Sequence, residues 1–426
     1  MNKEVISMKK RVLIVSSFGF PVPAAKGGAV QTLIENLIKE NEFHDSLELS
    51  IASIYNKDAF NKSLLYKKTN FIYVQKPFLI YQLDKIYEII YNKIKKKTHK
   101  YDKNYIWKIY AILKMINHLI KSNYDFIIFE NSQFLLNILK STKVSRKYEN
   151  KIFFHIHNDI TSDINSILLK KCNIISVSNY LTNQASTISQ IDLKNKNYVL
   201  KNCIDCSKFS KELTNKDRIE LKNNLGIKED KKILLFVGRL VPEKGILEVV
   251  NTAINLIKDN CVLLIVGSFN FNSAETSLFE KELHNKCKKY DEYIKFTGYV
   301  EYDELWKYYK ISDLAILPSK CNEAAGLTML ESLLNEVPLI TTKVGGIQEY
   351  IKNDWATFVE NDHNLENILL KESRKILNSY NLFKENAIKT SKIIKRKYNL
   401  SEYYTNFIEI LDNNIEKEDL YGDKEK

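Results

Sequence analysis

Short apolar runs alternate along the chain with longer segments in which apolar residues recur every three or four positions. The first run, RVLIVSS at residues 11–17, is typical of a buried strand. The loop FGFPVPAAKGG follows, and AVQTLIENLIKE then has apolar residues at helical spacing. A strand, a glycine-rich loop and a helix in this order open a parallel α/β domain.

The same alternation continues in two series. We expect further strands of the first series at residues 49–53, 125–130, 151–157, 173–178 and 198–202. The second series begins with KKILLFVG at 231–238, and its further strands are expected at 261–267, 293–300, 313–319 and 337–342. Two such series predict an α/β protein with two Rossmann-like, doubly wound domains.

The polar stretch 205–230 sets the expected domain boundary. We assign residues 1–205 to an N-terminal Rossmann-like domain and residues 206–389 to a C-terminal one. A helix at about 390–412 is expected to pack back on the first domain, and 413–426 form a charged tail.

Composition changes the picture in one region. The chain has a net charge of +12, and residues 57–121 hold fifteen lysines against four acidic residues, a net +11. No run of 18 apolar residues occurs, and the early run VLIV is too short for a signal-peptide core, so we expect a cytoplasmic protein. The one C-x-x-C, Cys203 and Cys206, lacks a second pair of zinc ligands, so no metal is expected.

The strongest chemical signal is LPSKCNEAAGLTMLE, with Glu323 and Glu331 eight positions apart. A strand ends before it and a helix is expected to begin near Gly326, so backbone N–H groups of Gly326, Leu327 and Thr328 would suit a diphosphate. Each carboxylate can accept two hydroxyl hydrogen bonds, as vicinal diols offer. The alternative is that both acids only favour the helix dipole.

The second signal is GRLVPEKG at residues 238–245. The preceding strand brings Gly238 and Arg239 to the carboxyl edge of the sheet, and Lys244 lies at the start of the next helix. An arginine and a lysine there can neutralise a leaving diphosphate without a metal. The alternative is a pair of ordinary surface cations.

Together these motifs resemble the retaining glycosyltransferases of family 4, bacterial surface-polysaccharide type, whose GT-B fold has two Rossmann-like domains facing across a cleft. The resemblance covers nearly the whole chain. It also includes, in order, KGGAVQTLIENL, FFHIHND, SVSNYL, LKNCIDCSKF, FTGYV and TTKVGGIQEYI.

The resemblance implies roles in the second domain. Arg239 and Lys244 would hold the donor diphosphate, Glu323 the donor-sugar hydroxyls and Glu331 the ribose diol. Further donor contacts are implied for Gly238, Tyr299, Gly326, Leu327 and Thr328.

In the first domain, Gly28 would let the backbone approach the reacting centre, and His157 would lie near the donor sugar. Aligned otherwise, the motif gives that role to His155; we favour His157 because it is last on its strand. The implied catalytic residues are therefore Glu323, His157, Arg239 and Lys244.

The resemblance further implies transfer from a nucleotide sugar, with UDP expected, to a glycan or lipid-linked acceptor in surface-polysaccharide synthesis, without cofactor or metal. Cys203 replaces the usual glycine before I-D, and Ala324 and Ala325 replace a common glycine and aromatic, which changes the expected shape of the donor pocket. Oligomeric state is left open.

The lysine-rich stretch 57–121 also contains amphipathic, tyrosine-rich segments that suit an anionic membrane surface, so the protein is expected to be peripheral on the inner face of the membrane. The alternative is a solvated lysine face over an ordinary core. Other functions to weigh are a GT-B sugar-nucleotide epimerase, an inverting transferase and, more remotely, a basic nucleic-acid-binding protein, although no nucleic-acid-binding motif is found.

Overall fold

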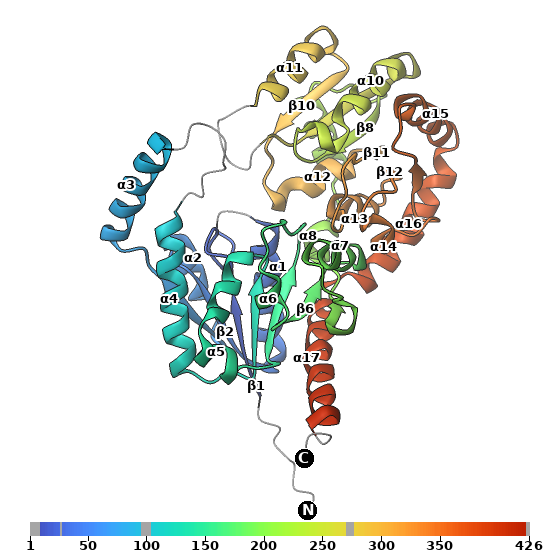
Figure 1. Cartoon of the computed structure of the whole chain (residues 1–426). Helices are drawn as coiled ribbons and strands as arrows, with labels where there is room; N and C mark the ends of the chain where they lie inside the picture. The colour runs from blue at the N-terminus through green and yellow to red at the C-terminus, as the bar shows by residue number, and fades with distance from the viewer. Residues whose placement is uncertain (1–8, 26–27, 95–103, 270–276, 423–426) are drawn as a thin grey trace, which may run out of the picture. The chain divides into compact units, whose positions relative to one another are not determined.

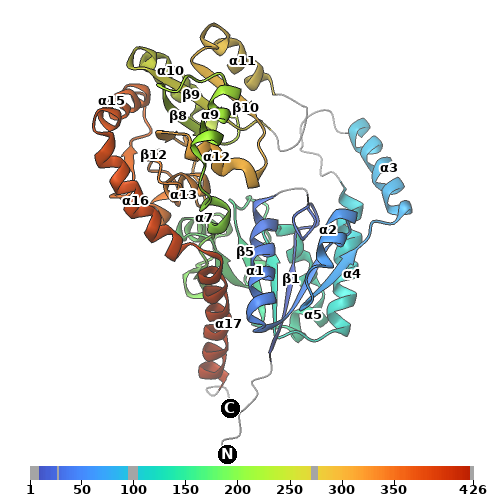
Figure 2. The same cartoon turned by 180° about the vertical axis from the view of Figure 1, so that it is seen from behind.

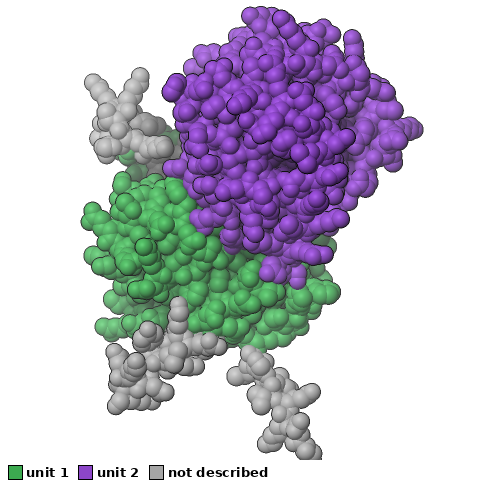
Figure 3. All heavy atoms as spheres, turned by 90° about the vertical axis from the view of Figure 1, so that its right-hand side faces the viewer, with its two compact units in different colours: residues 1–200, 403–426 green, residues 201–402 purple. Residues whose placement is uncertain are grey.

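The computed structural model describes residues 9–25, 28–94, 104–269 and 277–422. The chain forms two compact units, coloured separately in Figure 3: unit 1 comprises residues 1–200 and 403–426, and unit 2 comprises residues 201–402. Each unit is built on one β-sheet, and every strand pair in both sheets is parallel. The predicted α/β fold with two Rossmann-like domains is therefore confirmed.

The sheet of unit 1 has seven strands in the order β3-β2-β1-β4-β5-β6-β7. Their bounds are β1 Lys10–Val15, β2 Leu47–Ile54, β3 Thr69–Val74, β4 Phe126–Glu130, β5 Ile152–Ile156, β6 Asn173–Ser176 and β7 Asn197–Val199. The strand order reverses between β1 and β4, which creates a topological switch point at the carboxyl ends of these two strands.

Helices lie on both faces of this sheet, as the opposite views in Figures 1 and 2 show. They are α1 Ala29–His44, α2 Lys57–Ser63, α3 Phe78–Ile94, α4 Tyr105–Lys121, η1 Gln133–Lys140, α5 Thr142–Lys147, α6 Ser166–Leu169, α7 Asn179–Ser189 and η2 Lys194–Lys196. Helix α1 follows from its sequence pattern, because Leu33, Ile34, Leu37 and Ile38 form one buried stripe.

The sheet of unit 2 has six strands in the order β10-β9-β8-β11-β12-β13, with a switch point between β8 and β11. The strands are β8 Lys232–Val237, β9 Cys261–Val266, β10 Ile294–Gly298, β11 Leu314–Leu317, β12 Leu339–Thr342 and β13 Thr357–Val359. The helices are α8 Cys206–Phe209, α9 Asn215–Asn224, η3 Pro242–Lys244, α10 Ile246–Leu256, η4 Ile257–Asp259, α11 Leu278–Cys287, η5 Lys288–Tyr290, η6 Tyr302–Glu304, α12 Leu305–Lys310, α13 Leu327–Leu334, α14 Ile347–Tyr350, α15 Leu365–Asn378 and α16 Tyr380–Lys397.

Two strands, β3 and β13, were not predicted. Both lie at an edge of their sheet and are only partly buried, so they lack the continuous apolar run that marks the central strands. Strand β3 also lies within the lysine-rich stretch 57–121, for which no strand was predicted.

The end of the chain differs from the expected ranges. Residues 390–397 belong to α16 in unit 2, where Ser391 and Ile394 are buried and the Ser391 hydroxyl donates to the Leu334 carbonyl at 2.7 Å. A separate helix, α17 (Leu400–Gly422), supplies the C-terminal part of unit 1, where Tyr404 donates to Asn41 at 2.7 Å. Much of the expected tail from 413 therefore continues this helix, and the unit boundary lies at 200/201 rather than 205/206.

Candidate active site

A cavity of about 310 Å³ lies at the switch point of unit 2, beyond the carboxyl ends of β8 and β11. We call it the switch-point cavity. Its lining consists entirely of unit 2 residues: Phe236, Val237, Gly238, Arg239, Lys244, Val266, Gly267, Ser268, Tyr299, Val300, Tyr302, Leu305, Leu317, Ser319, Glu323, Thr328, Met329 and Glu331. Its volume is within the range of small-molecule sites, and its position is the one at which open α/β sheets bind ligands.

Most of the second-domain residues singled out from the sequence line this cavity. They are Gly238, Arg239, Lys244, Tyr299, Glu323, Thr328 and Glu331. Gly326 and Leu327 are not part of the lining; they form the N-cap and the first residue of α13. As the first residues of a helix, Leu327 and Thr328 have backbone N–H groups without an intrahelical acceptor, the arrangement that binds anions at helix N-termini.

Lys244 and Glu323, 79 positions apart in sequence, form an ion pair in the cavity wall. Glu323 also accepts a hydrogen bond from the Ser319 hydroxyl. The surrounding backbone holds both partners, because the Lys320 N–H donates to the Glu243 carbonyl at 2.8 Å and the Gly346 N–H donates to the Glu323 carbonyl at 2.7 Å. A cation and a carboxylate are thereby placed together at one edge of the cavity.

Two glycines allow this close packing of loops. Gly245 has φ +71°, and a Cβ there would lie 2.2 Å from the Pro318 carbonyl oxygen. Gly345 has φ +58°, and its Cβ would lie 2.3 Å from the Glu323 carbonyl oxygen. Glycine is therefore required at both positions, once in GRLVPEKG and once in the TTKVGG motif.

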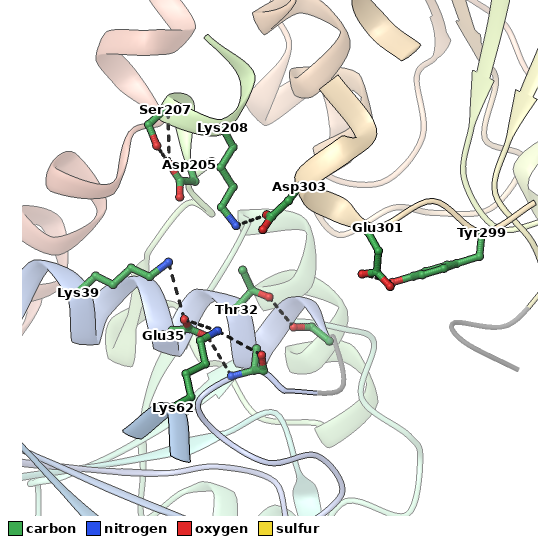
Figure 4. A network of polar contacts seen from close by, with 12 residues as sticks. Thr32, Glu35, Lys39, Lys62, Asp205, Ser207, Lys208, Tyr299, Glu301 and Asp303 are labelled. Carbon is green, nitrogen blue, oxygen red and sulfur yellow. Dashed lines mark hydrogen bonds and ion pairs between the residues drawn. The ribbon is translucent and has the colours of Figure 1, made fainter. Parts of the chain in front are cut away.

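Arg239 is the second residue after β8 and is solvent-exposed. Within the described part of the chain its guanidinium makes no hydrogen bond or ion pair, so its five N–H donors remain available to a ligand in the cavity. Tyr299 lies on the same cavity after β10, with its hydroxyl 3.3 Å from Glu301 (Figure 4).

Glu331 lies on α13 and is buried in the cavity wall. Tyr309 donates to its Oε2 at 3.0 Å, and Tyr302 lines the same cavity. Burial raises the pKa of Glu331 to about 7, although both tyrosines act in the opposite direction. The carboxyl group can therefore gain or lose its proton near neutral pH.

Three residues of this site, Ser319, Tyr302 and Tyr309, were not predicted from the sequence. Ser319 stands within the quoted motif directly after β11, a position that could have been recognised. Tyr302 and Tyr309 follow no recognisable motif, and only the packing of η6 and α12 brings them to Glu331.

In unit 1, the predicted residue Gly28 is the N-cap of α1 with φ +107°, and the loop residues 26–27 lie outside the described part. The buried Glu35 holds the preceding segment: it accepts from the Ala24 N–H at 2.9 Å and pairs with Lys62 at 2.7 Å (Figure 4). Tyr66 donates to the same carboxylate at 2.9 Å. This network fixes the chain as it enters the glycine loop.

A second cluster in unit 1 joins both candidate histidines to an acid that the sequence analysis did not single out. Glu130 ends β4, and its Oε1 lies 3.2 Å from His155 Nδ1 and its Oε2 2.8 Å from His157 Nε2. All three side chains are buried, and within the described residues His155 Nε2 and His157 Nδ1 have no hydrogen-bond partner. The signal that could have revealed Glu130 is its place at a strand's carboxyl end.

The electrostatics of this cluster favour an ionised acid and a neutral His157. Burial alone would raise the pKa of Glu130, but the charge and hydrogen bonds of the two imidazoles outweigh it and lower the pKa to about 2. Burial lowers the pKa of His157 to about 4. The three ligand atoms also lie within 4.8 Å of one another, close enough for a metal ion, so the composition fits either a hydrogen-bonded triad or a metal site.

Residues 217–392 match the family model described as "Glycosyl transferases group 1". Over this range unit 2 is similar to the group 1 glycosyltransferases. The matched residues include GRLVPEKG and the E-x7-E motif, and thus the whole lining of the switch-point cavity. This similarity does not favour the nucleic-acid-binding alternative, which leaves both motifs unexplained.

Curated relatives and a solved structure agree with this similarity. The chain is 29% identical over 187 residues to an uncharacterised glycosyltransferase of Methanocaldococcus jannaschii, covering 43% of this chain and 46% of that protein. It is 28% identical over 134 residues to the lipopolysaccharide 1,2-N-acetylglucosaminetransferase of Salmonella typhimurium, covering 31% and 35%. The chain thus spans less than half the length of either relative.

The solved structure of the Anabaena protein HepE in complex with UDP and glucose has the same fold, with a TM-score of 0.68 at 15% identity, covering 95% of this chain and 99% of that one. Units 1 and 2 are therefore the two Rossmann-like domains of a GT-B fold. Among the described residues, no helix is long and apolar enough to cross a membrane.

Proposed function

We propose that this chain is a retaining glycosyltransferase that moves a sugar from a nucleoside-diphosphate sugar to a glycan or lipid-linked acceptor. The observation that carries the proposal is the switch-point cavity, where Arg239 and Lys244 share one lining with Glu323 and Glu331. A diphosphate needs cations and N–H donors, whereas the sugar and ribose diols need carboxylate acceptors. The cavity offers both within a domain similar to the group 1 glycosyltransferases.

The diphosphate would be bound by Arg239, Lys244 and the N-terminus of α13. Arg239 is exposed at the cavity and can form two parallel hydrogen bonds to phosphate oxygens. Lys244 would exchange part of its ion pair with Glu323 for the phosphate, and the N–H groups of Leu327 and Thr328 would add neutral donors.

The nucleoside and sugar would be bound by the two acids. Glu331, inside the first turns of α13, would accept hydrogen bonds from the ribose diol, and Glu323 would accept them from donor-sugar hydroxyls. Gly238 and Tyr299 line the same cavity and would also contact the donor. UDP is the donor nucleotide we propose, supported by the UDP complex of the structurally similar Anabaena protein.

The reaction we propose breaks the bond between the sugar C1 and the leaving phosphate oxygen, and then forms a bond from C1 to the acceptor oxygen on the same face. The acceptor hydroxyl proton passes to the leaving phosphate oxygen. Arg239, Lys244 and the helix N-terminus would stabilise the charge that develops on the diphosphate, so catalysis is electrostatic preorganisation and positioning.

From unit 1 we propose contributions by Gly28 and His157. Gly28 gives close backbone approach, and His157, positioned by Glu130, presents a neutral imidazole whose Nδ1 has no partner within the described residues. We prefer His157 to His155 because it lies one residue beyond the end of β5.

We further propose that catalysis needs no metal, because Arg239 and Lys244 supply the positive charge. EDTA treatment should then leave the transfer rate unchanged, whereas a resident ion at Glu130, His155 and His157 would be found by elemental analysis of the purified protein.

We propose that the acceptor belongs to cell-surface polysaccharide synthesis. The enzyme would be cytoplasmic and would meet this acceptor at the inner face of the membrane. Support comes from the Salmonella relative, which acts on lipopolysaccharide, and from the basic stretch 57–121.

The function is tested by thermal-shift measurements on the full chain against UDP, GDP and ADP and their sugars, followed by product analysis. We expect stabilisation by one nucleotide series, slow donor hydrolysis and an α-linked product from an α-linked donor. Formation of an epimerised nucleotide sugar, or inversion at C1, would contradict the proposal. Binding of oligonucleotides without any nucleotide-sugar effect would favour the nucleic-acid alternative.

A further inference from the structure

Helices α3 and α4 of unit 1 expose an unusual amount of apolar surface. Of the 22 large hydrophobic side chains that are exposed among the described residues, eleven lie on these two helices. They are Phe78, Leu79, Tyr81, Leu83, Ile86, Ile89, Ile90, Tyr105, Ile109, Leu113 and Ile120. Figure 1 shows α3 beside α4 at the margin of unit 1. Scattered exposed apolar residues are ordinary, but such concentration marks an interaction surface.

On each helix the exposed apolar residues form a continuous stripe. On α3, Leu79, Leu83, Ile86 and Ile90 follow one another at spacings of four, three and four, and they are 68, 38, 52 and 49% exposed. On α4, the corresponding stripe contains Tyr105, Ile109, Leu113 and Ile120. We call these two stripes together the α3–α4 face.

The polar side of α3 is already satisfied by α4. Asp84 is buried, accepts from the Ile106 N–H at 2.9 Å and pairs with Lys76 at 2.7 Å. Tyr87 stacks on Tyr105 with ring centroids 5.6 Å apart. These contacts fix which side of α3 is turned to solvent, and it is the apolar side.

The charge around the face is positive. The described residues 76–94 and 104–121 contain six lysines against two acidic residues, a net +4. Lys85 and Lys114 flank the stripes and lie over the rings of Tyr81 and Tyr110, at 4.6 and 5.5 Å from the centroids. An apolar stripe bordered by lysines and tyrosines is the composition of helices that lie in a membrane interface.

We propose that the α3–α4 face binds an anionic lipid bilayer, with the apolar stripes among the upper acyl chains and the lysines at the headgroups. This proposal deepens the proposed function. As a site at which the chain meets a lipid-linked acceptor, the α3–α4 face also rests on that function. The stripe runs from Leu79 to Ile90 of α3, a helix of 17 residues or about 25 Å, so we place the helix in the plane of the membrane rather than across it. A second copy of this chain is a poorer occupant, because pairing two such faces would bring two segments of net charge +4 together.

The test uses the full chain and two kinds of vesicle. One kind is pure phosphatidylcholine, and the other contains about 30% phosphatidylglycerol as the anionic lipid. We expect the chain to sediment with the anionic vesicles. Binding should fall by about tenfold or more at about 0.5 M salt, because this is roughly five times the ionic strength at which the Debye length is about 10 Å, and the lysine charges are then screened. The double variant Leu83→Gln/Ile90→Gln should reduce binding by about tenfold or more, since it removes apolar contacts with the acyl chains.

The matched control is Leu278→Gln/Leu382→Gln, which changes two exposed leucines of unit 2, 78 and 68% exposed, and should bind vesicles like the unmodified chain. All four positions are exposed, so both variants should fold, as circular dichroism would check. Lys85→Glu/Lys114→Glu should weaken binding to anionic vesicles but not the thermal shift by UDP.

The proposal is overturned if the unmodified chain fails to bind anionic vesicles at low salt, or if the stripe variant binds as well as its control. A dimer in size-exclusion chromatography that the stripe variant dissociates would instead assign the face to a second copy. UDP stabilisation measured on the same samples separates the two proposals: intact UDP binding without vesicle binding overturns the membrane face alone, and the reverse result overturns the donor site alone.

Discussion

Lys244 and Glu323 form an ion pair at the edge of the switch-point cavity, although they come from different βα loops of unit 2. The pair links the two motifs that carry the chemistry. It also means that a ligand diphosphate must compete with Glu323 for the Lys244 ammonium, and a ligand sugar must compete with Lys244 for the Glu323 carboxylate. Several mutational outcomes depend on this competition.

Removing either cation should slow transfer strongly. We expect Lys244→Ala and Arg239→Ala each to lower kcat/KM by about 10²–10³-fold, the order of a lost electrostatic contact to the developing charge. The matched control is Lys320→Ala, since Lys320 is close in sequence to the cavity residue Ser319 but pairs with Glu248 and does not line the cavity. Activity within a few-fold of the unmodified chain in both cation variants would exclude their role at the leaving group.

Glu323→Gln should separate binding from turnover. Without the carboxylate, Lys244 becomes fully available to phosphate, so UDP affinity should rise by about two- to tenfold, while kcat falls about a hundredfold because the sugar hydroxyls lose a charged acceptor and keep only one amide oxygen. Titration calorimetry with UDP and steady-state kinetics measure the two effects. A parallel loss of affinity and turnover would show that Glu323 chiefly holds the loop.

Donor binding should depend on pH through Glu331. Burial raises the pKa of this carboxyl group to about 7, and hydroxyl donors from ribose would favour its ionised form and lower the pKa in the complex. Binding then releases a proton, so affinity should rise as pH increases from about 5.5 to 7, by at most about tenfold per pH unit, and level off above 7. In the Glu331→Gln variant the ligand's own phosphate still titrates, but the pH dependence of affinity that comes from the Glu331 carboxyl group should disappear. An identical pH profile of affinity in both proteins would contradict the ribose contact.

Glu130→Gln should act through His157. The amide has one oxygen, so it cannot accept from both imidazoles, and the tautomer and orientation of His157 lose their support. We expect kcat to fall by about 10–100-fold with the donor KM nearly unchanged, together with a shifted pH–rate profile. Equal losses in thermal stability and activity, with an unchanged pH profile, would point to a purely structural acid.

Gly245→Ala should destabilise unit 2. The new Cβ would lie 2.2 Å from the Pro318 carbonyl oxygen, and φ is +71°, so the variant suffers both backbone strain and a clash. Gly298→Ala is the control, because Gly298 has φ +70° but nothing within 4 Å of the added Cβ. We expect Gly245→Ala to lower the free energy of unfolding by at least about 2 kcal/mol more than the control in denaturant titration; equal losses would mean that the two loops move apart freely.

Several features were predictable because each is a local property of the sequence. The central strands are continuous apolar runs, and the helix after the glycine loop has one buried stripe, so the two parallel sheets could be predicted. Arg239, Lys244 and Glu323 could be placed in the segments that follow strands, and Glu331 in the next helix, for the same reason. The edge strands β3 and β13 could not, because half-exposed strands carry a weaker pattern.

The sequence by itself thus determined the fold class, the order of the elements and which charged residues follow the strands. Only the tertiary structure decided that Lys244 pairs with Glu323, that Tyr309 donates to Glu331, and that Glu130 joins His155 and His157. These contacts join residues between about 20 and 80 positions apart, and they exist because parallel strands bring distant loops to one edge of a sheet. Local patterns report burial and period, whereas such partnerships depend on how the strands are ordered.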